Sequence, residues 1–175
     1  MIGLKRKTVR LMEHKAEWAE FFGSEAATIH QHIGEIIADI QHVGSTSVPG
    51  LPAKPILDIA VGVSSSEVIA KVAERLSRIG YIDRGDGGRD GGYLLVKESE
   101  SDVRTIHVHI VELTDTQWRN YIGFRDILRQ DVAIRQKYAE LKQQLAEKFR
   151  DDRKSYTSAK SDFIRGILSE KFGDK

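Results

Sequence analysis

The first segment that could do chemistry is a turn of small residues, Gly44, Ser45, Thr46 and Ser47, within the stretch HVGSTSVPGLPAKPILDIAVGV. Glycine has no Cβ, so a turn that contains it lets the backbone approach a ligand closely. The amides of such a turn, together with its hydroxyl groups, can surround a phosphate group. The alternative is an ordinary polar turn, and the acidic residue that follows in the sequence favours the phosphate-binding interpretation.

That acidic residue, Asp58, interrupts the otherwise apolar run from Ile56 to Val63. Such a run is typical of a strand that is covered on both faces. Burying an unpaired carboxylate is unfavourable, so Asp58 must meet a cation, a hydrogen-bond cluster or the mouth of a cleft. A hard cation such as Mg²⁺ would suit its oxygen atoms. The alternative is structural: Asp58 caps a neighbouring loop or pairs with Lys54.

Two histidines, His107 and His109, lie in the apolar run from Val103 to Val111. Alternate residues of a strand share a face, so both imidazoles should point to one side while their apolar neighbours pack on the other. With Glu112 just beyond, the pair could form a metal site or a proton-transfer site. The alternative is a pair of histidines at the core edge or the surface. If this strand lies next to the strand of Asp58, three polar groups converge.

Basic side chains could supply contacts to phosphate groups. Lys54 follows the small-residue turn, Arg125 lies in a predicted helix, and Lys160 comes four residues after Tyr156 in another. Arginine offers a bidentate fork to phosphate, and lysine offers a point charge. The alternative for Arg125 is a structural ion pair with Asp126.

A glycine-rich segment, GDGGRDGG at Gly85 to Gly92, also resembles a phosphate-binding loop. It lacks the GK[ST] ending of a Walker motif, and no strand-to-helix context surrounds it. We therefore expect a hairpin loop that could close over a cleft, with Arg89 as its candidate contact.

The elements that must position these groups follow from hydrophobic periodicity and turn residues. Strands are predicted at 9–11, 40–43, 56–63, 81–83, 93–96 and 103–111, and helices at 14–37, 66–79, 115–128, 131–149 and 155–172. Asp131 and Ser155 are the expected N-caps of the last two helices. The order predicts an α/β (α+β) fold, with a mixed β-sheet, flanking helices and a helical C-terminal third.

Length and composition limit the possible classes of protein. The 175 residues predict one domain at 1–175, with a sheet-bearing core at about 9–112 and C-terminal helices at about 115–172. The absence of cysteine excludes a disulfide scaffold and a thiolate zinc site. A net charge of +1 gives no indication of nucleic-acid binding. We expect no signal peptide, no membrane span and a cytoplasmic location.

The motifs resemble the GrpB family. The run HVGSTSVPGLPAKPILDI is followed in order by IHVHIVE, GFRDILR, QKYAELKQQLA and SYTSAKSDFI, so the resemblance covers about Val9 to Leu168. It implies a nucleotidyltransferase-like fold, in which a Gly-Ser turn precedes a strand that carries Asp-x-Asp or Asp-x-Glu. A later strand carries a third carboxylate, and the carboxylates of such enzymes hold two Mg²⁺ ions.

The resemblance matches Gly44 and Ser45 to that turn and Asp58 to the first carboxylate. Ala60 stands where the second carboxylate is expected, which is a departure from the superfamily pattern. His107 and His109 lie on the strand where the third carboxylate is expected. The implied site is therefore one aspartate with imidazoles, which would hold one metal, a transition metal or none.

The leading hypothesis is a nucleotidyltransferase-like enzyme that transfers a nucleotidyl group from a nucleoside triphosphate to an unknown acceptor. Asp58, His107 and His109 would be the catalytic and metal-ligating residues, with Mg²⁺ or Mn²⁺ as the cofactor and Zn²⁺ as the alternative. The nucleotide, or another phosphorylated small molecule, would contact His42, Gly44, Ser45, Thr46, Ser47, Lys54, Arg125 and Lys160. The alternatives are a non-catalytic nucleotide or phosphometabolite binding module and a metal-dependent phosphohydrolase.

Overall fold

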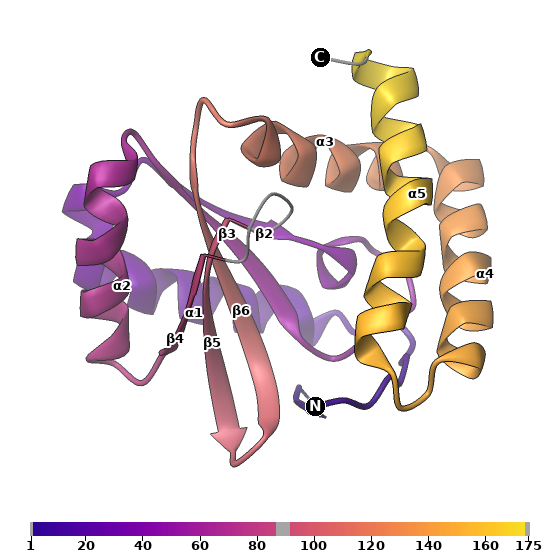
Figure 1. Cartoon of the computed structure of the whole chain (residues 1–175), viewed down its shortest axis with the longest axis horizontal. Helices are drawn as coiled ribbons and strands as arrows, with labels where there is room; N and C mark the ends of the chain where they lie inside the picture. The colour runs from indigo at the N-terminus through magenta and orange to yellow at the C-terminus, as the bar shows by residue number, and fades with distance from the viewer. Residues whose placement is uncertain (1, 87–91, 174–175) are drawn as a thin grey trace.

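The computed structural model describes residues 2–86 and 92–173. Figure 1 shows a twisted sheet with helices on both sides of it and with the C-terminal helices gathered together. Most of the predicted glycine-rich loop, including Arg89, lies outside the described residues. In the described ranges, no helix combines the length and the apolar character needed to cross a membrane.

A mixed six-stranded sheet forms the centre of the molecule. Its strands are β1 (Leu4–Lys5), β2 (Asp39–Val43), β3 (Leu57–Val63), β4 (Ile82–Asp86), β5 (Tyr93–Glu100) and β6 (Val103–Glu112). The order is β2-β3-β6-β5-β4, and the short β1 pairs with β6. Strands β3 and β6 are parallel, and the other pairs are antiparallel.

The parallel pairing of β3 with β6 places the polar residues of both strands side by side. Asp58 is the register partner of His107, and Ala60 is the partner of His109. Because side chains alternate along a strand, these four residues share one face of the sheet. The register thus brings together residues that are 49 positions apart in the sequence.

In the part of the chain that the structure describes, five α-helices flank the sheet: α1 (Glu17–Ile33), α2 (Ile69–Ser77), α3 (Thr116–Gln130), α4 (Val132–Lys148) and α5 (Arg153–Phe172). Helices α1 and α2 lie together on one side of the sheet, and α3, α4 and α5 gather on the other side of the molecule (Figure 1). Short 3₁₀ turns occur at Gly34–Ile36, Ser45–Ser47 and Ser66–Val68.

The main apolar core lies between the sheet and the first two helices. It includes Leu57, Ile59, Val61 and Val63 of β3, which alternate with the residues of the polar face. A second, smaller apolar cluster joins the loop after the Gly44 turn to the last three helices, and it contains Val48, Leu51, Leu128 and Tyr138.

Most of the predicted elements are confirmed, but several details are wrong, including β5, which extends to Glu100 and not only to Val96. The predicted strand at 9–11 is irregular chain, and the edge strand is Leu4–Lys5 instead. The predicted first helix is shorter, because α1 ends at Ile33 and a 3₁₀ turn follows. The N-cap of α5 is Asp152, whose carboxylate accepts a hydrogen bond from the Ser155 amide. Asp131 caps α4 as predicted.

Candidate functional site

Asp58, His107 and His109 meet on the polar face of the sheet, because β3 and β6 are neighbours, the condition on which their convergence depended. The Nδ1 atom of His107 lies 2.9 Å from Oδ1 of Asp58. The Nε2 atom of His109 lies 3.5 Å from the same oxygen. The side chain of Asp58 is 32% exposed, so the carboxylate sits at an opening and not behind sealed packing.

The hydrogen bonds of His107 fix the position of its proton. A guanidinium can only donate, so the Nε2 atom of His107 must accept from Nη2 of Arg153 at 3.1 Å. The Nδ1 atom therefore carries the proton and donates it to Asp58. Burial lowers the pKa of His107, and the contact with Asp58 offsets this lowering only in part. His107 is thus a neutral link between Arg153 and Asp58.

The carboxylate of Asp58 is held in its ionised form. Burial would raise the pKa of Asp58, but the hydrogen bonds from both imidazoles together hold that pKa well below its usual range. The far side of His109 is also engaged, because its Nδ1 atom lies 3.1 Å from the hydroxyl oxygen of Tyr121. Asp58 is therefore the anionic centre of a hydrogen-bonded chain that runs from α3 to α5.

The small-residue turn passes directly in front of this carboxylate. Gly44 adopts φ +66°, and a Cβ added to it would lie 2.6 Å from Oδ2 of Asp58. Only glycine combines this conformation with this close approach. The hydroxyl of Ser47 donates to the carbonyl of Gly44 at 2.6 Å, which closes the turn.

His42 supports the turn from behind. Its ring stacks on Phe22 with centroids 4.7 Å apart, and its Nε2 atom lies 3.0 Å from the hydroxyl oxygen of Thr46. Burial lowers the pKa of His42 to about 4. Of the predicted ligand contacts, His42 and Ser47 hold the loop, while Ser45 and Thr46 line a cavity beside it.

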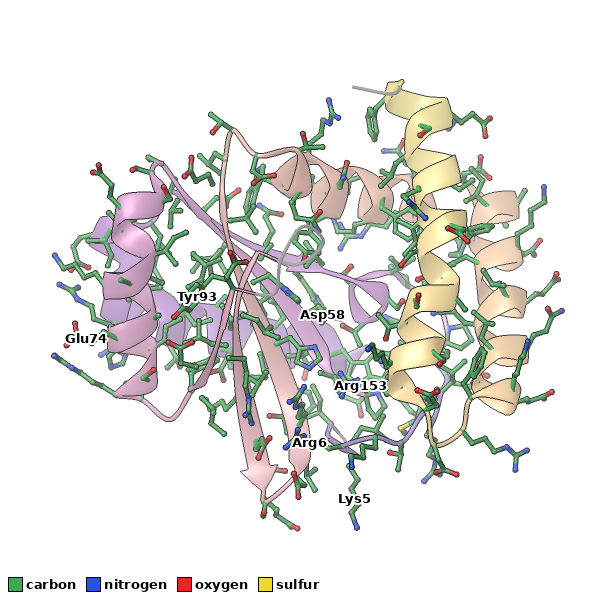
Figure 2. The ribbon with its side chains drawn as sticks, in the orientation of Figure 1. Lys5, Arg6, Asp58, Glu74, Tyr93 and Arg153 are labelled. Carbon is green, nitrogen blue, oxygen red and sulfur yellow. The ribbon has the colours of Figure 1, made fainter. Side chains whose placement is uncertain are left out.

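That cavity has a volume of about 350 Å³ and opens in front of Asp58. Five basic side chains line it: Lys54, Arg104, Lys142, Arg153 and Lys160. Asp58 is the only carboxylate among its described lining residues. Figure 2 shows Arg153 on α5 close to Asp58, in the space between the helix and the sheet. We call this space the basic cavity.

Two of the predicted lysines lie against one aromatic ring in the basic cavity. The Nζ atoms of Lys54 and Lys160 lie 5.1 Å and 4.6 Å from the ring centroid of Tyr156. Burial, and then the neighbouring positive charges, lower the pKa of Lys54 to about 7. Burial also lowers the pKa of Lys160 to about 8, although Asp58 opposes this effect. An anionic ligand bound near these two lysines would therefore reduce the repulsion between them.

Three basic residues of the basic cavity, Arg104, Lys142 and Arg153, were missed by sequence reasoning. Arg153 lies three and seven positions before Tyr156 and Lys160, so a helical-face argument could have found it. The sequence does not distinguish Lys142 from the other lysines of the C-terminal helices. It is 1% exposed, and its ammonium donates to the Pro52 carbonyl.

Arg125 was predicted to contact the ligand, but its described hydrogen bonds are structural. Its guanidinium donates to Gln41, to the His42 carbonyl and to Asp126 at distances of 2.7, 3.1 and 2.7 Å. The bonds to Gln41 and His42 attach α3 to β2, and the bond to Asp126 lies within α3. Arg129 similarly donates twice to the Ser47 carbonyl, at 3.0 and 2.8 Å, and so fixes the turn.

A second cavity, of about 570 Å³, adjoins the first between α3 and α5. It shares Ser45, Asp58, His109, Thr157 and Lys160 with the basic cavity. Arg125 lies in its wall, as do several aromatic residues. Asp58 therefore stands at the junction of two connected spaces.

Ala60 occupies the position at which the superfamily pattern has its second carboxylate. Ala60 is fully buried and lies next to His109 in the sheet register. The donor atoms that a metal could use come from Asp58, His107 and His109, and they lie within 4.8 Å of one another. The described site thus offers one carboxylate and two imidazoles.

The sheet and its helices define a class of fold. A crystal structure of a mutant Cid1 poly(U) polymerase bound to MgATP superposes with a TM-score of 0.50 at 14% identity, over 75% of this chain and 45% of that one. At this identity the likeness concerns the fold alone. The architecture is therefore nucleotidyltransferase-like, as predicted.

Within that class, the chain belongs to the GrpB family, whose profile, described as GrpB protein, matches residues 8–170. The glutamate-rich protein GrpB of Alkalihalophilus pseudofirmus is 37% identical over 97% of this chain and 99% of its own. The protein YqkA of Bacillus subtilis is 35% identical over 92% of this chain, which spans 46% of that relative. The crystal structure of conserved protein GrpB from Enterococcus faecalis matches with a TM-score of 0.82 at 37% identity, over 92% of this chain and 96% of that one.

Proposed function

We propose that this chain binds a nucleoside triphosphate in the cleft at Asp58 and transfers its nucleotidyl group to an acceptor. One observation carries the proposal: five basic side chains surround a single ionised carboxylate in a cavity of about 350 Å³. Concentrated positive charge in a partly desolvated cavity favours a compact polyanion. A triphosphate is a ligand of that chemistry.

The phosphate groups would lie against Lys54, Arg153 and Lys160. Burial lowers the pKa of Lys54 most, and the charge of Lys160 lowers it further, so an anion placed between the two lysines would relieve that repulsion. The guanidinium of Arg153 can offer a bidentate fork to phosphate oxygens. Gly44 leaves room for a ligand to reach the carboxylate, since it has no side chain at the point of closest approach.

The donor set at Asp58 fits one divalent ion. Mg²⁺ prefers an environment of oxygen ligands alone, whereas one carboxylate with two imidazoles suits Mn²⁺ or Zn²⁺. For His107 to act as a ligand through Nε2, Arg153 would have to move from that atom toward the phosphate groups. When bound, such an ion would neutralise charge on the transferred phosphoryl group.

The residues of the chain would supply the remaining requirements of the reaction. Lys54, Arg153 and Lys160 would stabilise the negative charge that accumulates on the pyrophosphate leaving group. The imidazoles would keep Asp58 ionised and oriented, because each places a nitrogen beside the same carboxylate oxygen. The Gly44 turn would position the phosphates for transfer.

A second candidate function is binding of a nucleotide or phosphorylated metabolite without turnover. Ala60 favours this candidate, because it removes the carboxylate that a second metal ion would need on the same face of β3. The contact of Arg153 with His107 favours it as well, since a protein cation already stands beside the donor atoms.

Release of pyrophosphate distinguishes these candidates. The protein is incubated with each nucleoside triphosphate, with Mg²⁺, Mn²⁺ or Zn²⁺, and with a small-molecule extract of bacterial cells as the source of acceptor. Nucleotidyl transfer predicts pyrophosphate release that Asp58→Asn abolishes and Asp83→Asn on β4 leaves unchanged. Tight nucleotide binding with no pyrophosphate would contradict transfer and support the binding module, and release of orthophosphate would instead indicate a phosphohydrolase.

A further inference from the structure

The second cavity differs chemically from the basic cavity that it adjoins. It is the larger of the two, at about 570 Å³ against about 350 Å³. A space of this size is within the range that holds a small organic ligand. The two cavities share Asp58 and Lys160 in their walls, so a single ligand can extend from one cavity into the other.

Three aromatic side chains line the second cavity. Tyr121 and Phe124 from α3 face it together with Tyr138 from α4. Phe124 is held in place by an edge-on contact with Tyr138, with centroids 5.2 Å apart. Tyr121 lies against the ring of His109, at 5.1 Å. Fixed aromatic rings favour a planar ring system in the ligand, because stacking on them needs little rearrangement.

Uncharged polar groups also line that wall, beside the charged side chains of Asp58, Arg125, Lys160, Asp162 and Arg165. Asn120 lies one helical turn before Phe124 on α3, and both line the cavity with Gln117. A side-chain amide offers a donor and an acceptor together, which matches the edge of a heterocyclic base. The hydroxyl group of Ser161 on α5 lines the opposite side. The combination of aromatic faces and amides suits a nucleobase with its ribose.

We infer that the second cavity is the binding site for the nucleoside portion of the ligand, and this inference rests on the proposed function. The ligand's phosphates would occupy the basic cavity, and its base would lie against Phe124 and Asn120. The reacting phosphorus would then be next to Asp58, where the two cavities meet. A ligand without a base would leave the second cavity unused.

Calorimetric titration of the full chain with ATP and with inorganic tripolyphosphate tests this division. We expect ATP to bind at least about tenfold more tightly than tripolyphosphate, because stacking adds to the phosphate contacts. Phe124→Leu and Asn120→Ala should each remove most of this difference and change tripolyphosphate affinity less than about twofold. Asn120 belongs to neither apolar cluster, so Asn120→Ala keeps the test decisive if Phe124→Leu fails to fold.

The matched control is Phe21→Leu, since Phe21 is exposed on α1 and lines neither cavity. It should leave both affinities unchanged. Equal affinities for ATP and tripolyphosphate would overturn the nucleoside site and leave phosphate binding at the basic cavity intact. An ATP affinity that neither cavity variant alters would also overturn it. Failure of both probes to bind would overturn the proposed function itself.

Discussion

The two faces of the central sheet are built from the same strands but have opposite properties. On one face, Leu57 and Ile59 of β3 and their neighbours pack against α1 and α2 in a continuous apolar core. On the other face, Asp58, His107 and His109 line cavities that also contain residues of α3 and α5. Figure 2 shows Asp58 of this face near Arg153 of α5. The alternation of side chains along a strand lets one segment serve stability and chemistry separately.

The polar face is also a face of small side chains. Ala60 and Gly62 follow Asp58 on the same side of β3, and a Cβ added to Gly62 would lie 2.5 Å from Leu113 and 3.0 Å from Trp118. The small residues let α3 approach the strand, while the larger cavity lies beside them. Substitutions on the two faces should therefore separate loss of folding from loss of ligand binding.

The largest expected effect is on the apolar face. Leu57→Ala should lower the free energy of unfolding by about 2–5 kcal/mol, since it leaves a cavity among fully packed side chains. Urea denaturation followed by circular dichroism measures this change. Asp58→Asn, one residue away on the polar face, provides the comparison and should lower stability much less. An equal loss in both variants would make Asp58 a structural residue.

The second-largest expected effect is a loss of stability where the Gly44 turn passes close to Asp58. Gly44→Ala should lower stability by about 1–3 kcal/mol, because a non-glycine residue is strained at φ +66° and its Cβ would meet the Asp58 carboxylate. Gly50→Ala is the matched control, with φ +76° and no atom within 4 Å of the added Cβ. If the two variants are equally stable in urea, the contact with Asp58 contributes nothing.

These two faces also show what the sequence could and could not predict. The apolar run around Asp58 and the His-x-His pair identified the strands and the side on which their polar groups point. In that reasoning, the convergence of Asp58 with His107 depended on the two strands being neighbours. The sequence could not establish this, because pairing between distant strands leaves no local pattern.

The helical contribution to the site was harder to predict. Lys142 and Arg153 reach the basic cavity because of how α4 and α5 pack against the sheet, and a surface lysine has the same sequence signal as a buried one. Arg125 was predicted as a ligand contact. Its described hydrogen bonds connect α3 to β2, and it also lines the second cavity, so the contact stays a prediction.

Removing a lysine from the polar face should weaken polyanion binding. We expect Lys54→Met and Lys160→Met each to lower tripolyphosphate affinity about tenfold, the size of a charge-assisted contact. Lys71→Met is the control, because Lys71 is exposed on α2 beyond the opposite face. Isothermal titration gives the three affinities, and an equal loss in the control would mean that binding depends only on net charge.

The smallest expected effect is a pH dependence of the same binding reaction. The lowered pKa values, about 7 for Lys54 and about 8 for Lys160, mean that both lysines are protonated at pH 6 and largely neutral at pH 9. A polyanion binds the protonated forms, so affinity should fall severalfold as pH rises through this window. The decline should be shallower in Lys54→Met, and a flat profile in the unaltered chain would contradict the assignment.

The central claim is that the polar face around Asp58 is a nucleotide site, and melting temperature measures it most directly. A ligand that binds only the folded chain raises its melting temperature. We expect ATP to raise the melting temperature by several degrees and Mn²⁺ or Zn²⁺ to add a further increase. Asp58→Asn should abolish the metal increment while melting close to the unaltered chain without ligand. No rise with any nucleoside triphosphate, with or without metal, would contradict the account.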